Sequence, residues 1–231
     1  MADGPERESP EAPQEPLSFF AEIAPALLAV VALWAVSLWA WPRLPERVPT
    51  HWGISGKPDA WGPKSAMVFT LPGVLTGLVA LVILVSRPAL DFKSAKGMDP
   101  RVRRMILGLT SLLFVVLHGM MLFHLMSGTP EASPAFIWVV VGLFLVALGN
   151  QFPRLEPNQW AGIRIPPTLE DRRVWKSTHR FAAPFFMGAG MIMVLAAFLP
   201  EAIGQWVALT VLLGAIVPPI VHAYRLRSRL S

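Results

Sequence analysis

The sequence predicts an all-α, polytopic membrane protein with six transmembrane helices. Of its 231 residues, 54% are hydrophobic and only 15% are charged, whereas about a quarter of the residues are charged in a typical soluble domain. A membrane-spanning helix needs about 20 mostly apolar residues, and six windows approach or meet this requirement. These windows are residues 20–41, 66–86, 105–126, 135–150, 181–199 and 204–223. Prolines and glycines interrupt several of them, and we expect kinks there, which neighbouring helices can tolerate.

The sequence divides into a polar tail and two membrane regions. Residues 1–18 contain four prolines and five acidic residues, a composition that predicts disorder, and they lack the basic start of a cleaved signal peptide. The first membrane region, residues 19–104, contains a long loop at 41–65 that is rich in Pro, Gly and Trp. The second, residues 105–231, contains the longer loop 149–180. We name these loops the outer cap (41–65) and the inner motif (149–180).

Basic residues predict the orientation. If six helices alternate, the two termini, the 87–104 loop and the inner motif share one side, which then holds 16 of the 20 Lys and Arg residues. Cytoplasmic loops carry such an excess, so both termini and the inner motif should be cytoplasmic and the outer cap extracytoplasmic. The net charge of +5 then reflects the excess of Lys and Arg in the cytoplasmic loops of a membrane protein. We therefore expect contact with membrane lipids and no direct nucleic-acid binding.

The outer cap is expected to be a compact structured loop. Its glycines and prolines predict turns, and Trp52 and Trp61 are expected to pack on the bilayer surface. His51 and Asp59 are eight residues apart, but two ligands without a third are weak evidence for a metal. The chain also has no cysteine, which excludes thiolate ligands and disulfides. We therefore predict no metal and no cofactor.

The inner motif concentrates Arg, Pro, Trp, Asn and His. Thr168 followed by Asp171 resembles a capping box, which predicts a helix that starts there and continues into the fifth span. Two interpretations stay open. In one, a basic amphipathic helix lies on anionic headgroups. In the other, a polar cluster grips a partner or closes a pore, and its members are Asn158, Arg164, Trp175, His179 and Arg180.

Two further features bear on transport. The outer cap and the inner motif share a Pro-Arg-Leu start, at residues 42–44 and 153–155. Each lies between the first and second helix of a three-helix half, so the two loops fall on opposite membrane faces. This is the arrangement of an inverted repeat, which is common in transporters. In contrast, no span has a central charged residue, although ion-coupled carriers usually need one. His118 lies within the third span, where we expect it to hydrogen-bond inside the bundle.

Residues of both loops together resemble a known family. In the inner motif they are Gly149-Asn150, Pro153, Asn158, Gly162-Ile163-Arg164, Pro166, Thr168-Leu169, Trp175 and Thr178-His179-Arg180. In the outer cap they are Leu44-Pro45, Val48-Pro49-Thr50-His51, Gly56, Pro58-Asp59, Trp61-Gly62 and Lys64. The first set resembles the signature of the SdpI-type immunity proteins. The second resembles a domain of unknown function that often precedes this signature. The sequence departs from the family pattern at Ile165, Pro167 and Ala183.

The resemblance implies a non-enzymatic protein of the bacterial cytoplasmic membrane. Family members protect against a secreted peptide toxin of the sporulation-delaying type, and some are thought to act as signal receptors that capture a soluble transcriptional repressor. No catalytic residues are expected. The candidate contact residues in the inner motif are Asn150, Asn158, Gly162, Arg164, Pro166, Thr168, Trp175, Thr178, His179 and Arg180. Those in the outer cap are His51, Asp59, Trp61 and Lys64.

Two other classes of function stay open. The first is a transporter or permease for a small molecule or peptide, built on the inverted repeat. The second is a membrane enzyme that uses His51 or His179 as a base.

Overall fold

A computed structural model describes residues 19–53, 57–85, 100–128, 134–158 and 161–230. Within these ranges, six helices are long and apolar enough to cross a membrane, which confirms the predicted polytopic fold. They are α1 (Phe19–Ala40), α2 (Lys64–Val85), α3 (Pro100–Ser127), α4 (Pro134–Gln151), α6 (Arg172–Ala196) and α7 (Glu201–Leu230). The predicted disordered tail and most of the basic 87–104 loop lie outside the described residues.

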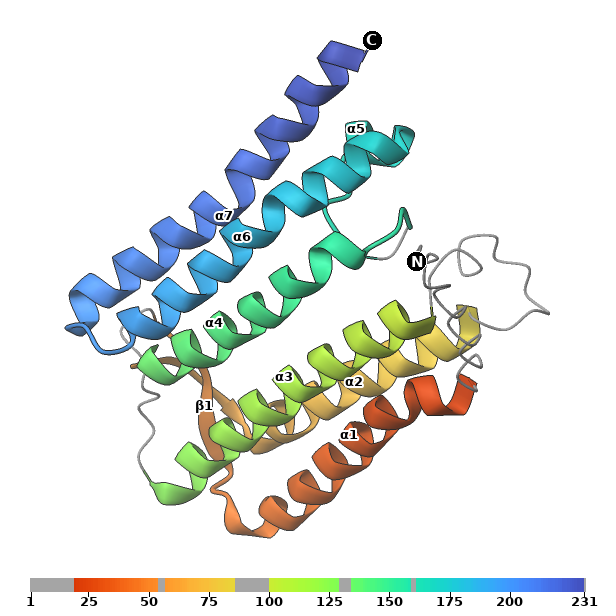
Figure 1. Ribbon diagram of the computed structural model, residues 1–231. Helices are drawn as coiled ribbons and strands as arrows, with labels where there is room; N and C mark the ends of the chain where they lie inside the picture. Colours follow the sequence, from red (N-terminus) through yellow and green to blue (C-terminus); the bar gives the residue numbers. More distant parts are fainter. Residues whose placement is uncertain (1–18, 54–56, 86–99, 129–133, 159–160, 231) are drawn as a thin grey trace, which may run out of the picture.

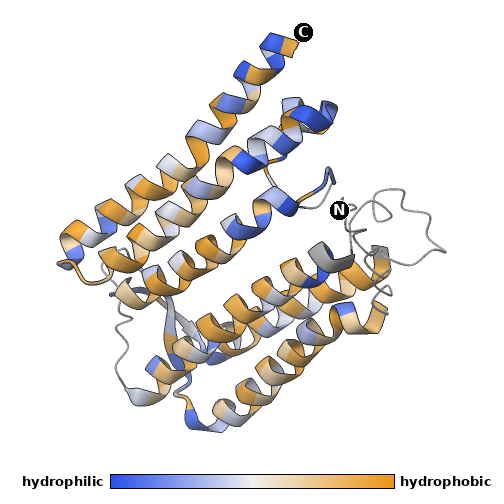
Figure 2. Cartoon of the chain, in the orientation of Figure 1, coloured by the Kyte–Doolittle hydropathy of each residue, from blue (hydrophilic) through white to orange (hydrophobic). Residues whose placement is uncertain are grey.

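The helices form two groups of three (Figure 1). In the N-terminal half, α1 packs against α2 and α3, and in the C-terminal half α6 lies between α4 and α7. The two halves meet mainly along α3 and α4, which run antiparallel. Figure 2 shows apolar residues along the helices and hydrophilic residues gathered at the bundle ends. The start of α1, the end of α7 and the inner motif lie at the same end of the bundle.

The outer cap contains a small β-hairpin, which the prediction of an all-α fold missed. Strand β1 (Arg47–Trp52) pairs antiparallel with β2 (Pro58–Pro63), with an irregularity in the register on either side of His51. Three prolines lie in these strands, which masks the strand pattern because proline cannot donate a ladder hydrogen bond. Trp52 is half-buried, whereas Trp61 on β2 is 51% exposed.

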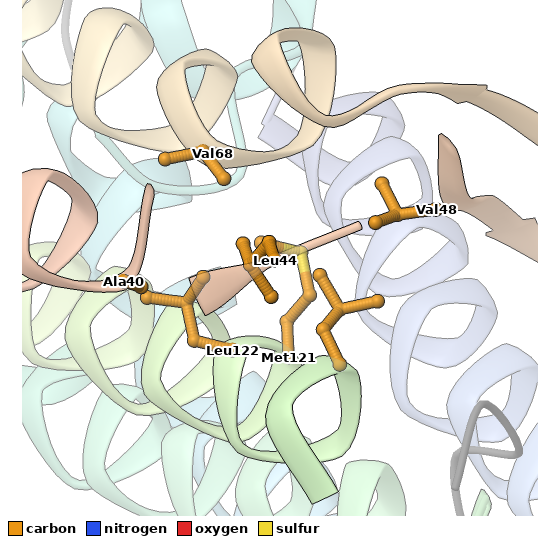
Figure 3. Packing of buried hydrophobic residues seen from close by; sticks show 7 residues of the cluster. Ala40, Leu44, Val48, Val68, Met121 and Leu122 are labelled. Atoms are coloured by element: carbon orange, nitrogen blue, oxygen red, sulfur yellow. The ribbon is translucent and has the colours of Figure 1, made fainter. Parts of the chain in front are cut away.

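One apolar cluster attaches the hairpin to the N-terminal half (Figure 3). Val48 of β1 is fully buried and packs in a cluster with residues from the end of α1, from α2 and from the end of α3. The buried members of the cluster are Ala40, Leu44, Val48, Val68, Met121, Leu122 and Leu125. Burying several such side chains contributes roughly 1.5–3 kcal/mol each, so the cap is held on the bundle by packing.

Glycines bring α4 and α6 into close contact. A Cβ atom on Gly142 would lie 2.6 Å from the carbonyl oxygen of Gly190, and one on Gly149 would lie 2.9 Å from Cβ of Phe186 and 3.0 Å from the Ala183 oxygen. Small residues let two membrane helices approach each other closely in this way. Ala183, where the family pattern commonly has Gly, thus lies at this helix contact.

The two halves use similar local structure where the first helix ends. Helix α1 is followed by the 3₁₀ helix η1 (Trp41–Arg43), and α4 by the 3₁₀ helix η4 (Phe152–Arg154). In each, the terminal arginine donates a hydrogen bond to a carbonyl four residues earlier, Arg43 to Trp39 and Arg154 to Asn150. This likeness adds local structural detail to the inverted repeat predicted from the sequence.

The leucine that follows each 3₁₀ helix continues the likeness. Leu44 and Leu155 are both buried and extended. The carbonyl of Leu44 accepts from Nζ of Lys64 at 3.4 Å, and that of Leu155 from Nε1 of Trp175 at 2.7 Å. Lys64 and Trp175 each lie in the first turns of the next membrane helix. The chain is therefore closed in a similar way at opposite ends of the bundle.

Candidate functional site

The inner motif is built around a buried indole. Trp175 is fully buried in the first turn of α6 and packs with Phe152, Leu155 and Ala182. Its Nε1–H donates to the Leu155 carbonyl at 2.7 Å. A buried tryptophan needs such a partner for its N–H. This bond joins the start of the motif to the start of α6.

His179 lies one turn further along α6, with 1% of its surface exposed. Its Nδ1 is 2.8 Å from the Trp175 carbonyl, and its Nε2 is 2.9 Å from the backbone nitrogen of Ile163. The first contact requires a proton on Nδ1, and the second requires a lone pair on Nε2. The ring is therefore in the neutral Nδ1–H form, stacked on Trp175 with a centroid separation of 4.2 Å. With both nitrogens engaged, His179 holds the loop on the helix.

Gly162 makes the contact with His179 possible. Its φ angle is +115°, a region that L-residues with a side chain rarely adopt. A Cβ atom at this position would also collide with Nε2 of His179 and lie 3.2 Å from Cη2 of Trp175. Gly162 is therefore required for two independent reasons, backbone conformation and space.

Asn158 closes the turn ahead of Gly162. Its Oδ1 accepts from the Ala161 nitrogen at 2.8 Å, and its Nδ2 donates to the Glu156 carbonyl at 2.9 Å. Asparagine side chains commonly replace backbone partners in turns of this kind. Asn158 thus shapes the loop through contacts with its own neighbours.

The predicted helix start at Thr168 is wrong. Thr168 lies inside the short helix α5 (Pro166–Glu170), where its Oγ1 accepts from the Ile165 nitrogen at 3.1 Å and donates to the Ile163 carbonyl at 2.7 Å. Helix α6 begins after Asp171, whose Oδ1 accepts from the Arg173 nitrogen at 2.7 Å. Asp171 is an N-cap instead of the third residue of a capping box. Pro166-Pro167 starts one helix and Asp171 starts the next.

Several ion pairs lie on the surface of the inner motif. Glu156 accepts from Lys176 at 2.9 Å and from Arg172 at 2.8 Å. The hydrogen bond from Lys176, followed by that from Arg172, lowers the pKa of Glu156. The side-chain hydrogen bond from Arg173 lowers the pKa of Asp171 to about 2. Glu156 therefore pairs with two residues that are one turn apart on α6.

Two of the candidate contact residues are exposed arginines. Arg164 and Arg180 are exposed, and in the described part of the chain neither forms an ion pair with a carboxylate. Pro166 and the side chain of Asn150 are also exposed, whereas Thr178 is fully buried. The candidate residues therefore fall into a buried group that builds the motif and an exposed group that is available for contacts.

The outer cap has its own polar pair. Nδ1 of His51 is 2.6 Å from Oδ1 of Asp59 across the hairpin, and both side chains are more than half exposed. Within the described ranges, no group of three His, Asp or Glu residues could hold a metal ion. Lys64 differs because it is buried, 3.0 Å from Glu46 and over the ring of Trp41 at 4.6 Å.

Two Ser–His pairs link helices that are distant in the sequence. Within the N-terminal half, Ser37 Oγ is 2.7 Å from Nε2 of His118 and donates to the Val68 carbonyl. This confirms the prediction that His118 hydrogen-bonds inside the bundle. In the C-terminal half, Ser177 Oγ is 3.0 Å from Nε2 of His222. The second pair was not predicted, because no local pattern joins residues 45 positions apart.

Comparisons with known proteins cover both membrane regions. The SdpI/YfhL protein family model matches residues 154–224, and the domain of unknown function DUF1648 matches residues 28–76. The chain is 28% identical to "Immunity protein SdpI" of Bacillus subtilis over 203 residues, which cover 87% of this chain and 94% of that protein. It is also 34% identical over 61 residues to an uncharacterized protein of Archaeoglobus fulgidus, covering 26% of this chain and 33% of that one.

No solved structure matches the chain significantly. The SdpI/YfhL match begins at Arg154 and extends through the inner motif and α6 into α7. The DUF1648 match covers most of α1, the outer cap and the first half of α2. Residues 154–224 therefore form a segment that matches the SdpI/YfhL protein family, and the domain of unknown function precedes this segment.

Proposed function

We propose that this protein is a membrane immunity protein that protects its cell against a secreted antimicrobial peptide. The observation that carries the proposal is the similarity to an immunity protein over 94% of that relative's length. The similarity includes both long loops, so it extends beyond the general composition of membrane helices. We further propose a non-enzymatic mode of action in the bacterial cytoplasmic membrane.

In this proposal the outer cap meets the toxin. It is expected on the extracytoplasmic side, because most Lys and Arg residues belong to the other side. Its exposed Trp61 and the exposed His51–Asp59 pair offer an aromatic surface and a polar one. Trp is among the residues that most often dominate binding at protein interfaces.

The inner motif has a different role in the proposal. Its exposed arginines, Arg164 and Arg180, are suited to contact a soluble protein, such as a transcriptional repressor, because Arg is also frequent at interface centres. Trp175, His179 and Gly162 support those arginines through the hydrogen bonds and close contacts described above. Capture of a repressor would make the protein a signal receptor as well as an immunity protein.

A survival assay tests the immunity proposal. The chain is expressed in bacteria sensitive to a panel of sporulation-delaying-type peptide toxins, and survival is measured against the empty vector at matched membrane levels. Protection against at least one toxin is expected. If no toxin in the panel gives protection, the immunity proposal fails, and uptake assays for small molecules and peptides would then test the transport alternative.

Substitutions can separate the role of the inner motif from that of the outer cap. The double variant Arg164→Ala/Arg180→Ala should keep its membrane level, because exposed substitutions usually change stability by no more than about 0.5 kcal/mol. If these arginines recruit a repressor, the variant should retain survival and lose the transcriptional response. Trp61→Ala should lose survival at an unchanged level. Unchanged survival in the Trp61 variant would remove this residue from the toxin contact.

A further inference from the structure

A groove opens between α3 and α4, where the two halves of the protein meet. It has a volume of about 180 Å³ and is lined by apolar side chains. Those that carry the argument are Leu109, Leu112 and Val116 from α3, and Val140, Leu143 and Ala147 from α4. All six belong to membrane-spanning segments. An apolar cavity of about this size stays free of water and accepts hydrocarbon.

A stripe of residues leads from this groove to the end of the bundle that holds the inner motif. Val140, Phe144 and Ala147 line the groove, and Gln151 and Arg154 continue the same spacing of four and three residues. Within α4, which ends at Gln151, residues at these spacings share one helix face. Arg154 follows in the 3₁₀ helix η4, and its Nη1 reaches back to Oε1 of Gln151. Arg154 lies about 12 Å beyond Ala147 along the helix axis. The stripe thus passes from hydrocarbon to a cation.

The guanidinium of Arg154 has donors available. Its Nη1 donates to the Asn150 carbonyl at 2.9 Å and to Oε1 of Gln151 at 3.4 Å. Among the described residues it forms no ion pair with a carboxylate, and it is exposed. The remaining N–H groups match the geometry of a phosphate, which arginine binds well. An apolar groove that ends at such a cation complements both parts of a phospholipid, the acyl chain and the phosphate.

We propose that this groove holds one phospholipid, with an acyl chain between α3 and α4 and the phosphate on Arg154. The bound lipid would fill the junction between the halves, where α3 and α4 pack far less extensively than α6 packs on α4 and α7. A second copy of this chain or a hydrophobic peptide could also cover an apolar groove. A phospholipid is favoured because the groove lies within the bilayer and the cation lies where a headgroup would be.

Photo-crosslinking tests the proposal with the full-length protein in nanodiscs of phosphatidylcholine. The probe is phosphatidylglycerol with a diazirine on one acyl chain, present as a minor component, and mass spectrometry locates the adducts. The proposal predicts adducts concentrated on residues 109–116 and 140–147, in excess over the exposed apolar residues of α7. Adduct density no higher on the groove than on α7 would overturn it.

Matched variants separate the two parts of the site. Ala147→Phe, which fills the groove, should remove most adducts, whereas Val217→Phe on the exposed face of α7 should not change them. Arg154→Gln should lower labelling about fivefold, the effect of one cation near a headgroup, and Arg225→Gln should leave it unchanged. If Ala147→Phe lowers the unfolding temperature, Val140→Leu replaces it as a gentler filling. Unchanged labelling in a folded groove-filling variant would refute the site.

Discussion

The backbone N–H of Ile163 donates to Nε2 of His179 across 16 residues of sequence, at 2.9 Å. The bond ties the loop of the inner motif to the first turns of α6. It also requires a neutral imidazole, because a protonated Nε2 could not accept it. His179 therefore acts as a structural acceptor, which makes a role as general base in this conformation incompatible with the loop contact.

Replacing His179 should destabilise the protein. His179→Ala leaves the half-buried N–H of Ile163 without its acceptor and opens a cavity beside Trp175. An unsatisfied donor costs about 1–3 kcal/mol, and the cavity adds to this. We expect a lower unfolding temperature in detergent and a lower membrane level. An unchanged unfolding temperature together with lost protection would instead assign His179 to a binding role.

Gly162→Ala should be among the most damaging single changes in the motif. The added methyl group meets both a positive φ and the ring of His179, and a strained backbone conformation alone costs about 1–3 kcal/mol. Gly188→Ala is the matched control, because a Cβ atom there meets nothing within 4 Å. The control should be neutral or slightly stabilising, since alanine favours helices over glycine. Equal unfolding temperatures for the two variants would contradict this account.

The equivalent closures at the two bundle ends can be compared directly. Trp175→Phe keeps an aromatic ring and removes the hydrogen bond to Leu155, so we expect a loss of about 1 kcal/mol. Lys64→Met keeps the aliphatic stem and removes the hydrogen bond to Leu44 and the ion pair with Glu46. Hydrogen exchange should then increase in the outer cap for Lys64→Met and in the inner motif for Trp175→Phe. Exchange that rises in both loops for either variant would indicate global unfolding instead.

The lowered pKa of Asp171 predicts how the stability of the first turn of α6 depends on pH. The hydrogen bond from the Arg173 side chain lowers the pKa of Asp171 to about 2, from its ordinary value of 3.8. A depressed carboxyl pKa stabilises the folded form above the unfolded pKa, and this contribution is lost as pH falls through the folded value. Exchange protection of the first turn of α6 should therefore stay constant from pH 7 to pH 5 and fall below about pH 4. Asp171→Asn should flatten this dependence, because asparagine also caps a helix but does not titrate there. Persistent pH dependence in Asp171→Asn would assign the effect to another group, such as Glu156.

The sequence predicted the number and order of the membrane helices well, because a bilayer demands long apolar segments and these are visible in composition alone. It did not predict the hairpin, since Pro49, Pro58 and Pro63 obscure the strand pattern. Thr168 was misread because its hydroxyl bonds back to Ile163 and Ile165 ahead of α5, whereas Asp171 caps α6. The separation of buried His179 from exposed Arg164 and Arg180 depends on tertiary packing, which residue types do not reveal.

The closures at Leu44 and Leu155 make the two faces of the protein respond to different surroundings. The outer one depends on an ammonium group whose carboxylate partner, Glu46, has a side chain that is 87% exposed. Dissolved ions weaken such exposed pairs. The inner one depends on a neutral indole buried among apolar side chains, which ionic strength hardly affects. High salt outside the cell should therefore weaken the closure at Leu44 and leave the closure at Leu155 unchanged.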